Sequence, residues 1–216
     1  MTADTMQRLI ALAMLPAGAI PDSARRMARF SLFDWMVVGR AGRDQPVARI
    51  VRDHVLAEGG NRVASLIGGG AAPARGAALA NGTISHALDY DDTHFGHIGH
   101  PSVGILPAAL AVAEVADAPA MAVADAFLLG AEASVRLGMV LGRGHYERGF
   151  HQTATAGAFG ATIAATRIAG LDQAQLRHAL SLTATRASGL KSQFGTMGTP
   201  FNAGIAASNG VEAADL

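Results

Sequence analysis

The sequence of 216 residues contains no cysteine, few aromatic residues (5%) and no excess of charge of either sign. Without cysteine the chain can form no disulfide or thiolate zinc site, and it has no cysteine nucleophile or iron–sulfur ligand. Because the formal net charge is +0 and no basic run occurs, nothing predicts binding to nucleic acid. These absences leave nitrogen and oxygen side chains to carry any chemistry.

Long apolar runs are absent as well. No segment reaches the roughly 18 uninterrupted apolar residues of a membrane span. Residues 1–15 contain Asp4 and Arg8, which makes them a poor signal peptide. We therefore expect a cytoplasmic protein that makes no contact with a membrane.

What the sequence has in abundance is small and apolar residues, spaced as in helices. Met27, Phe30, Phe33 and Val37, for example, share one helical face. Turn residues and periodicity predict helices over residues 4–15, 22–41, 46–58, 73–88, 102–116, 121–141, 154–168, 172–187 and 203–215. Residues 62–67 are typical of a short strand or an extended segment, followed by a flexible glycine turn. We expect one all-α domain over residues 1–216, built as a tightly packed helical array.

Two helix starts carry local signals. Asp22 is a candidate N-cap, because its carboxylate can accept from the free amides of a first turn. Asp172 and Gln175 have the spacing of a capping box, and Leu171 and Leu176 have that of a hydrophobic staple.

Residues 81–102 concentrate the polar chemistry. Three aspartates and four of the eight histidines fall within residues 86–100. On a helix, Asp89 could meet His86 or Thr93, while Asp91 and Asp92 would point elsewhere. Carboxylates this close raise one another's pKa unless histidines balance them.

Simpler interpretations of this stretch stay open. The cluster could be a solvated helix cap, and His86 could be a core histidine with a satisfied hydrogen bond. His94, His97 and His100 could bind a metal, although their spacing in a glycine-rich loop matches no helical metal-binding pair.

Two further polar segments lie downstream. In residues 149–153, His151 and Thr153 at a helix start could present an imidazole and backbone amides to an anion, or could simply cap the helix. Residues 191–202 form a polar, glycine-containing loop.

Together these three places resemble the MmgE/PrpD family, which includes 2-methylcitrate dehydratase, cis-aconitate decarboxylase and iminodisuccinate epimerase. The resemblance runs from about residue 5 to 216. Its matching segments are residues 81–83, 86–93 (His-Ala-Leu-Asp-Tyr-Asp-Asp-Thr), 100–102, 106–110, 149–153, 157–161, 188–190, 194–197 and 202–204.

The resemblance implies a large helical domain with a smaller α/β lid, an active site between them, a homodimer, and no metal or organic cofactor. It implies a small di- or tricarboxylate substrate and proton transfer at a carbon next to a carboxylate, with loss of water, loss of CO₂ or epimerisation. Histidine suits this role because its pKa lies near neutrality. By position the resemblance assigns catalysis to Asp89, His100 and His151, and substrate binding to His97, Thr153, Thr199 and Asn202.

Two departures from the family pattern give a second hypothesis. Members usually carry a lysine where this chain has Thr199, and threonine cannot supply a positive charge. Full-length members are also much longer, so we expect the chain to be incomplete and to lack the α/β lid. The alternative to a lyase is therefore a catalytically inactive, truncated paralogue that acts as a helical dimerisation module.

Overall fold

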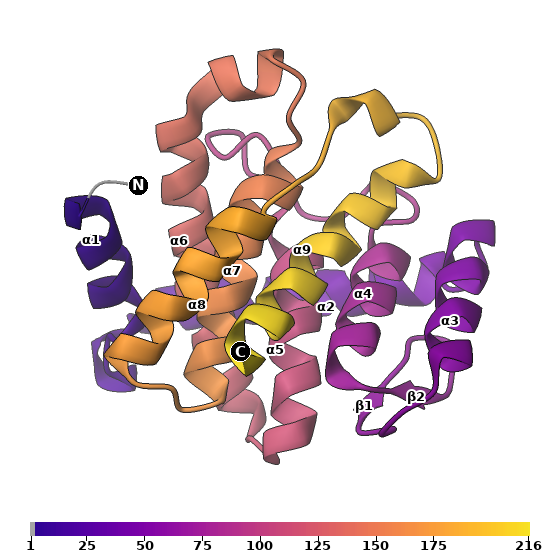
Figure 1. Cartoon of the computed structure of the whole chain (residues 1–216), viewed down its shortest axis with the longest axis horizontal. Coiled ribbons are helices and arrows are strands. Elements are labelled where there is room, and N and C mark those ends of the chain that lie inside the picture. Colours follow the sequence, from indigo (N-terminus) through magenta and orange to yellow (C-terminus); the bar gives the residue numbers. More distant parts are fainter. Residues whose placement is uncertain (1–2) are drawn as a thin grey trace.

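The computed structural model describes residues 3–216, and these residues fold into helices with one minimal hairpin (Figure 1). The α-helices are α1 (Ala3–Ala13), α2 (Asp22–Gly42), α3 (Pro46–Glu58), α4 (Ala74–Ser85), α5 (Pro101–Ala116), α6 (Ala120–Glu147), α7 (Gln152–Ile168), α8 (Gln173–Arg186) and α9 (Gly198–Asp215). Two 3-10 turns, η1 (Ala17–Ala19) and η2 (Lys191–Gln193), and two antiparallel strands, β1 (Ala64–Ser65) and β2 (Ala71–Ala72), complete the fold. The predicted all-α class is confirmed.

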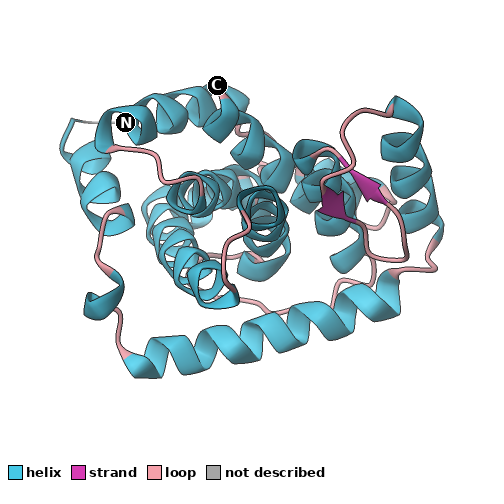
Figure 2. Cartoon of the chain, turned by 90° about the horizontal axis from the view of Figure 1, so that it is seen from below, coloured by secondary structure: helices cyan, strands magenta, loops and turns pink. Residues whose placement is uncertain are grey.

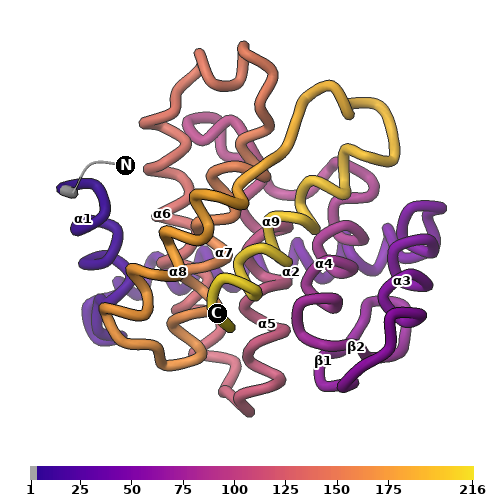
Figure 3. The backbone as a smooth tube through the Cα atoms, in the orientation of Figure 1, coloured from indigo at the N-terminus to yellow at the C-terminus, as the bar shows by residue number. Residues whose placement is uncertain are grey.

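Helix α7 forms the centre of the array. It packs against α5, α6 and α9, and α9 in turn packs against α4 (Figures 1 and 3). Gly130 on α6 faces Gly160 on α7, where a Cβ on either residue would collide with the backbone of the other helix. The small residues of the sequence therefore permit close helix crossings at the core.

Several predicted boundaries are confirmed. Helix α3 has the predicted limits, and α8 starts at the predicted capping box. There the Asp172 carboxylate accepts from the backbone amides of Ala174 (2.8 Å) and Gln175 (2.9 Å), and the Gln175 side chain accepts from the Asp172 amide (2.9 Å).

Other boundaries differ from the prediction. Pro21 occupies the N-cap position of α2, so Asp22 is its first helical residue and makes no cap hydrogen bond. Helix α4 ends at Ser85 rather than 88, because His86 leaves helical geometry and Asp89 takes a left-handed backbone conformation (φ 55°). Helix α6 continues to Glu147 past a kink at Gly142.

The apolar face predicted for α2 exists, but it points to solvent. Met27, Phe30 and Phe33 are 60%, 62% and 64% exposed, and Met36 and Val37 are half exposed. The helix is held by its opposite face, on which Ala28, Trp35 and Val38 are buried. Figure 2 shows α2 as a long helix along the outside of the domain.

A membrane-spanning element is not found in the described part of the chain. Within residues 3–216 no helix combines the length and the apolar character needed to cross a bilayer.

Candidate active site

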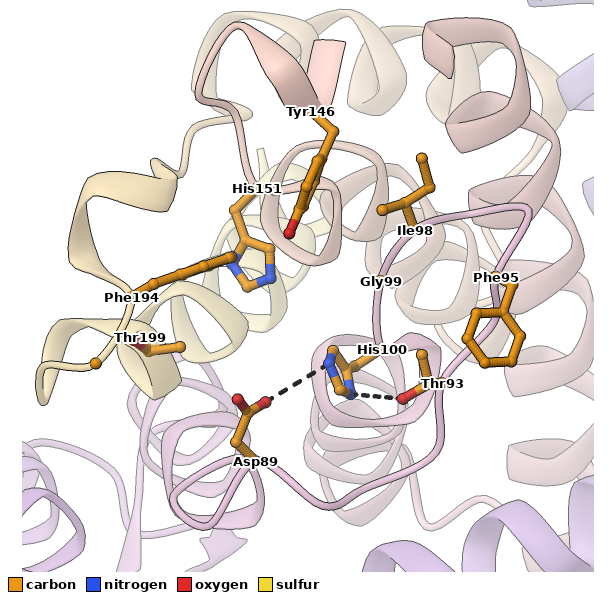
Figure 4. A pocket seen from close by; sticks show the side chains of 11 residues that line it. Asp89, Thr93, Phe95, Ile98, Gly99, His100, Tyr146, His151, Phe194 and Thr199 are labelled. Carbon is orange, nitrogen blue, oxygen red and sulfur yellow. Dashed lines mark hydrogen bonds and ion pairs between the residues drawn. The ribbon is translucent and has the colours of Figure 1, made fainter. Parts of the chain in front are cut away.

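A cavity of about 310 Å³ lies where the three polar segments meet (Figure 4). It opens between the loop that follows α4, the start of α7 and the loop between α8 and α9. Its lining residues are Asp89, Thr93, Phe95, Ile98, Gly99, His100, Tyr146, His151, Phe194, Gly195 and Thr199. The three residues predicted to be catalytic, Asp89, His100 and His151, therefore face one space although they come from distant parts of the chain.

His100 is fixed from two helices. It occupies the N-cap position of α5, with Pro101 as the first helical residue. Its backbone amide donates to Thr153 Oγ1 on α7 (2.9 Å). The Asp92 carboxylate accepts from the amide and the hydroxyl of Ser102, which ties the loop to the start of α5.

Asp91 joins the two histidines of this loop. His86 Nδ1 lies 2.8 Å from Asp91 Oδ1, and His100 Nδ1 lies 3.0 Å from Asp91 Oδ2. The expectation that Asp91 points away from the cluster is wrong, because the chain is not helical there and turns its side chain inward. Asp89 lies on the other edge of the rings, with Oδ1 3.7 Å from His86 Nε2 and 3.6 Å from His100 Nε2.

The charges of this cluster follow from its hydrogen bonds. Burial alone would raise the pKa of Asp91, but the hydrogen bonds from His100 and His86 outweigh it and lower the pKa to about 2. Burial opposes the charged form of His100, yet the hydrogen bond and charge of Asp91 outweigh burial and raise its pKa. Asp92 behaves oppositely to Asp91, since burial raises its pKa.

His151 is set by a different pair of segments. Its backbone amide donates to Gly189 O (3.0 Å), and the Lys191 amide donates to Gly149 O (2.8 Å). Gly189 has a positive φ of 147°, and a Cβ there would collide with Ala154. This close pairing of two loops presents His151 at the N-terminus of α7.

Among the described residues, no carboxylate is hydrogen-bonded to the ring of His151. Its Nδ1 lies 3.2 Å from Asn202 Nδ2, and its ring is nearly perpendicular to that of Phe194, with ring centroids 4.9 Å apart. Burial, followed by the nearby His86 and His100, lowers its pKa to about 3. The two cavity histidines thus differ in the direction of their pKa shift as well as in partner.

Comparison with known proteins assigns the chain to a family. The sequence profile described as the MmgE/PrpD N-terminal domain matches residues 11–216. The chain belongs to the MmgE/PrpD family.

Curated relatives of this MmgE/PrpD chain include cis-aconitate decarboxylases. It is 32% identical to the Homo sapiens enzyme over 145 residues and 32% identical to the Mus musculus enzyme over 146 residues. Each alignment covers 65% of this chain and 30% of the relative. The Aspergillus terreus enzyme is 30% identical over 142 residues, which are 62% of this chain and 29% of that protein. The matched region thus spans about a third of these relatives' length.

The four residues expected to bind substrate lie at different distances from the cavity. Thr199 lines the cavity, but its hydroxyl donates to Gln193 O (2.7 Å). Thr153 and Asn202 lie behind His100 and His151 as their hydrogen-bond partners. His97 is not among the lining residues: it is fully buried, with Nε2 3.5 Å from Ser134 Oγ on α6.

The predicted set of catalytic and binding residues leaves out three residues of this site. Tyr146 lines the cavity from the extension of α6, where a loop was expected. Asp91 and His86 form the layer behind His100. The density of aspartate and histidine in residues 86–100 was the available signal for these two. The assumption that the segment is helical led to the wrong prediction that the Asp91 side chain points away from the cluster.

The family resemblance implies no metal, yet one group in the site has suitable ligand atoms. Atoms of His86, Asp89, Asp91 and His100 lie within 4.8 Å of one another. Asp91 lies within 3.0 Å of Nδ1 of both histidines, but its Oδ2 and His86 Nε2 are buried without a hydrogen-bond partner, so hydrogen bonding satisfies only part of the cluster. The His94, His97 and His100 set considered from sequence is not a group of this kind among the described residues.

Positive charge is scarce at the cavity. None of its lining residues is lysine or arginine. Lys191, the single lysine of the sequence, places Nζ 3.6 Å from the ring centroid of Tyr146, which does line the cavity.

Proposed function

We propose that this MmgE/PrpD chain carries the acid–base residues of a cytoplasmic, cofactor-independent lyase or epimerase that acts on a small di- or tricarboxylate. The observation that supports this most directly is the meeting of Asp89, His100 and His151 in one cavity. The names of the relatives, which are cis-aconitate decarboxylases, favour a tricarboxylate. A cavity of about 310 Å³ is at the small end of ligand sites, which suits such a molecule.

The chemistry needs a group that exchanges a proton near neutral pH. Removing or delivering a proton beside a carboxylate develops charge on that carboxylate, and a positioned acid or base lowers the barrier. His100 has the raised pKa and the partly exposed ring for this role. Asp89, more exposed at the cavity, lies against the same ring edge and can orient it.

The test is turnover. The protein, in the full form that its gene encodes, is mixed with cis-aconitate, 2-methylcitrate or iminodisuccinate, and products are followed by NMR. We expect conversion of one of them, reduced about 100-fold or more by His100→Ala or His151→Ala. His178→Ala on the exposed face of α8 is the matched control and should keep full activity. No turnover of any substrate, or equal rates in all three variants, would overturn the proposal.

The proposal includes a homodimer. The exposed apolar stripe of α2 (Met27, Phe30, Phe33, Met36 and Val37) is the kind of surface that protein interfaces bury. A second copy of this chain is the partner expected there.

A catalytically inactive dimerisation module is the second candidate. It is favoured by the same α2 stripe together with Thr199 and the absence of lysine and arginine from the described cavity lining. It predicts a dimer that neither converts nor binds the three substrates, so calorimetric titration with each substrate separates the two candidates.

A further inference from the structure

The two cavity histidines have opposite kinds of partner at Nδ1: His100 has an acceptor there, and His151 has a donor. Nδ1 of His100 lies 3.0 Å from Asp91 Oδ2 and 3.4 Å from Thr93 Oγ1, whose hydroxyl donates to Asp91 O and can therefore accept from Nδ1. With its lowered pKa, Asp91 is a carboxylate, and a carboxylate only accepts hydrogen bonds. His100 therefore carries a proton on Nδ1, and its Nε2 is the nitrogen that faces Asp89 and the cavity.

At His151 the partner is an amide, and its orientation decides the tautomer. Asn202 Nδ2 lies 3.4 Å from Leu190 O and 3.2 Å from His151 Nδ1. Because a backbone carbonyl only accepts, the contact with Leu190 places the NH₂ group of Asn202 on this side. The amide then donates to His151 Nδ1, which must be unprotonated, so the proton of this neutral ring is on Nε2.

Burial makes both arrangements stable. The side chain of Asp91 is fully shielded, and Asn202 and His151 are 5% and 3% exposed. Water cannot readily replace either partner, and a buried donor or acceptor that loses its partner destabilises the fold. His86 completes the first arrangement, since its Nδ1 lies 2.8 Å from the other oxygen of Asp91 and holds the carboxylate in this orientation.

We propose that Asp91 and Asn202 are positioning residues that divide the work between the two histidines: His100 exchanges a proton through Nε2, and His151 acts as a fixed donor through Nε2–H. This inference deepens the proposed function and rests on it for the catalytic roles. The tautomers themselves can be measured without any turnover.

The division gives a balanced proton transfer. When a substrate C–H bond beside a carboxylate breaks, His100 Nε2 takes the proton and becomes imidazolium, and the electron pair moves toward the carboxylate. His100 keeps its Nδ1 proton, and the Asp91 carboxylate stabilises the new positive charge without itself becoming protonated. His151 Nε2–H donates to the oxygen on which negative charge develops. In the reverse sense His100 returns its proton to carbon.

The decisive experiment is NMR of the protein labelled with ¹⁵N in its histidine rings, recorded without substrate near pH 7.5. Protonated and bare ring nitrogens have widely separated ¹⁵N shifts, and His100→Gln and His151→Gln assign the signals. We expect the Nε2–H tautomer for His151, and for His100 a protonated Nδ1 with an Nε2 signal that titrates. An Nδ1–H tautomer at His151, or a bare Nδ1 at His100, would overturn the inference.

Three substitutions test the cause of the two tautomers. Asn202→Asp replaces the donor by an acceptor and should convert His151 to the Nδ1–H tautomer, whereas Asn202→Leu should leave a mixture. Asp91→Asn should shift the titration of the His100 Nε2 signal to lower pH and leave the His151 signal unchanged. An unchanged His151 tautomer in folded Asn202→Asp, shown by an unaltered amide spectrum elsewhere, would refute the role of Asn202.

Activity gives a separate readout. If the enzyme turns over, Asn202→Asp should lower kcat at least 10-fold with little change in KM, because the donor is needed most when charge develops. Should turnover be absent while the tautomers are as expected, the proposed function fails and the tautomer assignment stands.

Discussion

His86 Nδ1 and Asp91 Oδ1 lie 2.8 Å apart, and both side chains are completely shielded from solvent. A buried pair of this kind makes stability depend on pH. The pKa of Asp91 is lowered from 3.8 to about 2, so the folded state binds its proton less readily than the unfolded state. The resulting stabilisation, about 2 kcal/mol, is present above pH 4 and is lost as the pH falls toward 2.

Urea unfolding at a series of pH values checks this. The free energy of unfolding of the native chain should fall more steeply between pH 4 and 2 than that of Asp91→Asn, which cannot titrate. If the free energy of unfolding fell equally with pH in the two proteins, the loss of stability below pH 4 could not be assigned to Asp91.

Thr199 is the position at which a cation would change the site. Thr199→Lys should strengthen binding of cis-aconitate about 10-fold or more at low salt, because the new ammonium would lie beside a cavity whose described lining has no lysine or arginine. Loss of the hydroxyl bond to Gln193 O should cost about 1 kcal/mol of stability.

Calorimetric titration at two salt concentrations measures the effect, and Thr199→Gln is the neutral control of similar length. Equal affinity of the Lys and Gln variants would show that charge at this position does not reach the ligand.

The apolar stripe of α2 predicts the assembly state. Phe30→Glu combined with Phe33→Glu should turn a dimer into a monomer, because each new carboxylate would have to be buried at the interface. Arg29→Glu on the same helix changes charge without removing apolar surface and should remain dimeric. Sedimentation velocity gives the masses. A native chain that stays monomeric at tens of micromolar would speak against this interface.

Metal removal should leave activity unchanged. Asp91 already occupies Nδ1 of both His86 and His100, and the proposed proton transfer needs only the ring nitrogens. We expect equal kcat before and after exhaustive dialysis against EDTA, with elemental analysis as a check. Stoichiometric zinc or manganese, together with activity that returns only when the metal is restored, would refute cofactor independence.

Much of the fold could be predicted from local chemistry. The limits of α3 follow from Pro46 at its start and Gly59 after its end, and Asp172 and Gln175 predict the capping box of α8. The segment from His86 to His100 could not be predicted in the same way. Its backbone follows contacts such as Asp92 with Ser102 and His100 with Thr153, rather than helical periodicity.

The sequence by itself determined the helical class and the family, and it predicted Asp89, His100 and His151 as site residues, because periodicity and sequence motifs are local properties of the chain. Only the tertiary structure decided which face of α2 is exposed, that Asp91 turns inward between two histidines, and that Asn202 stands behind His151. The physical reason is that these features depend on which buried donor meets which acceptor across distant segments. That pairing exists only once the helices have packed.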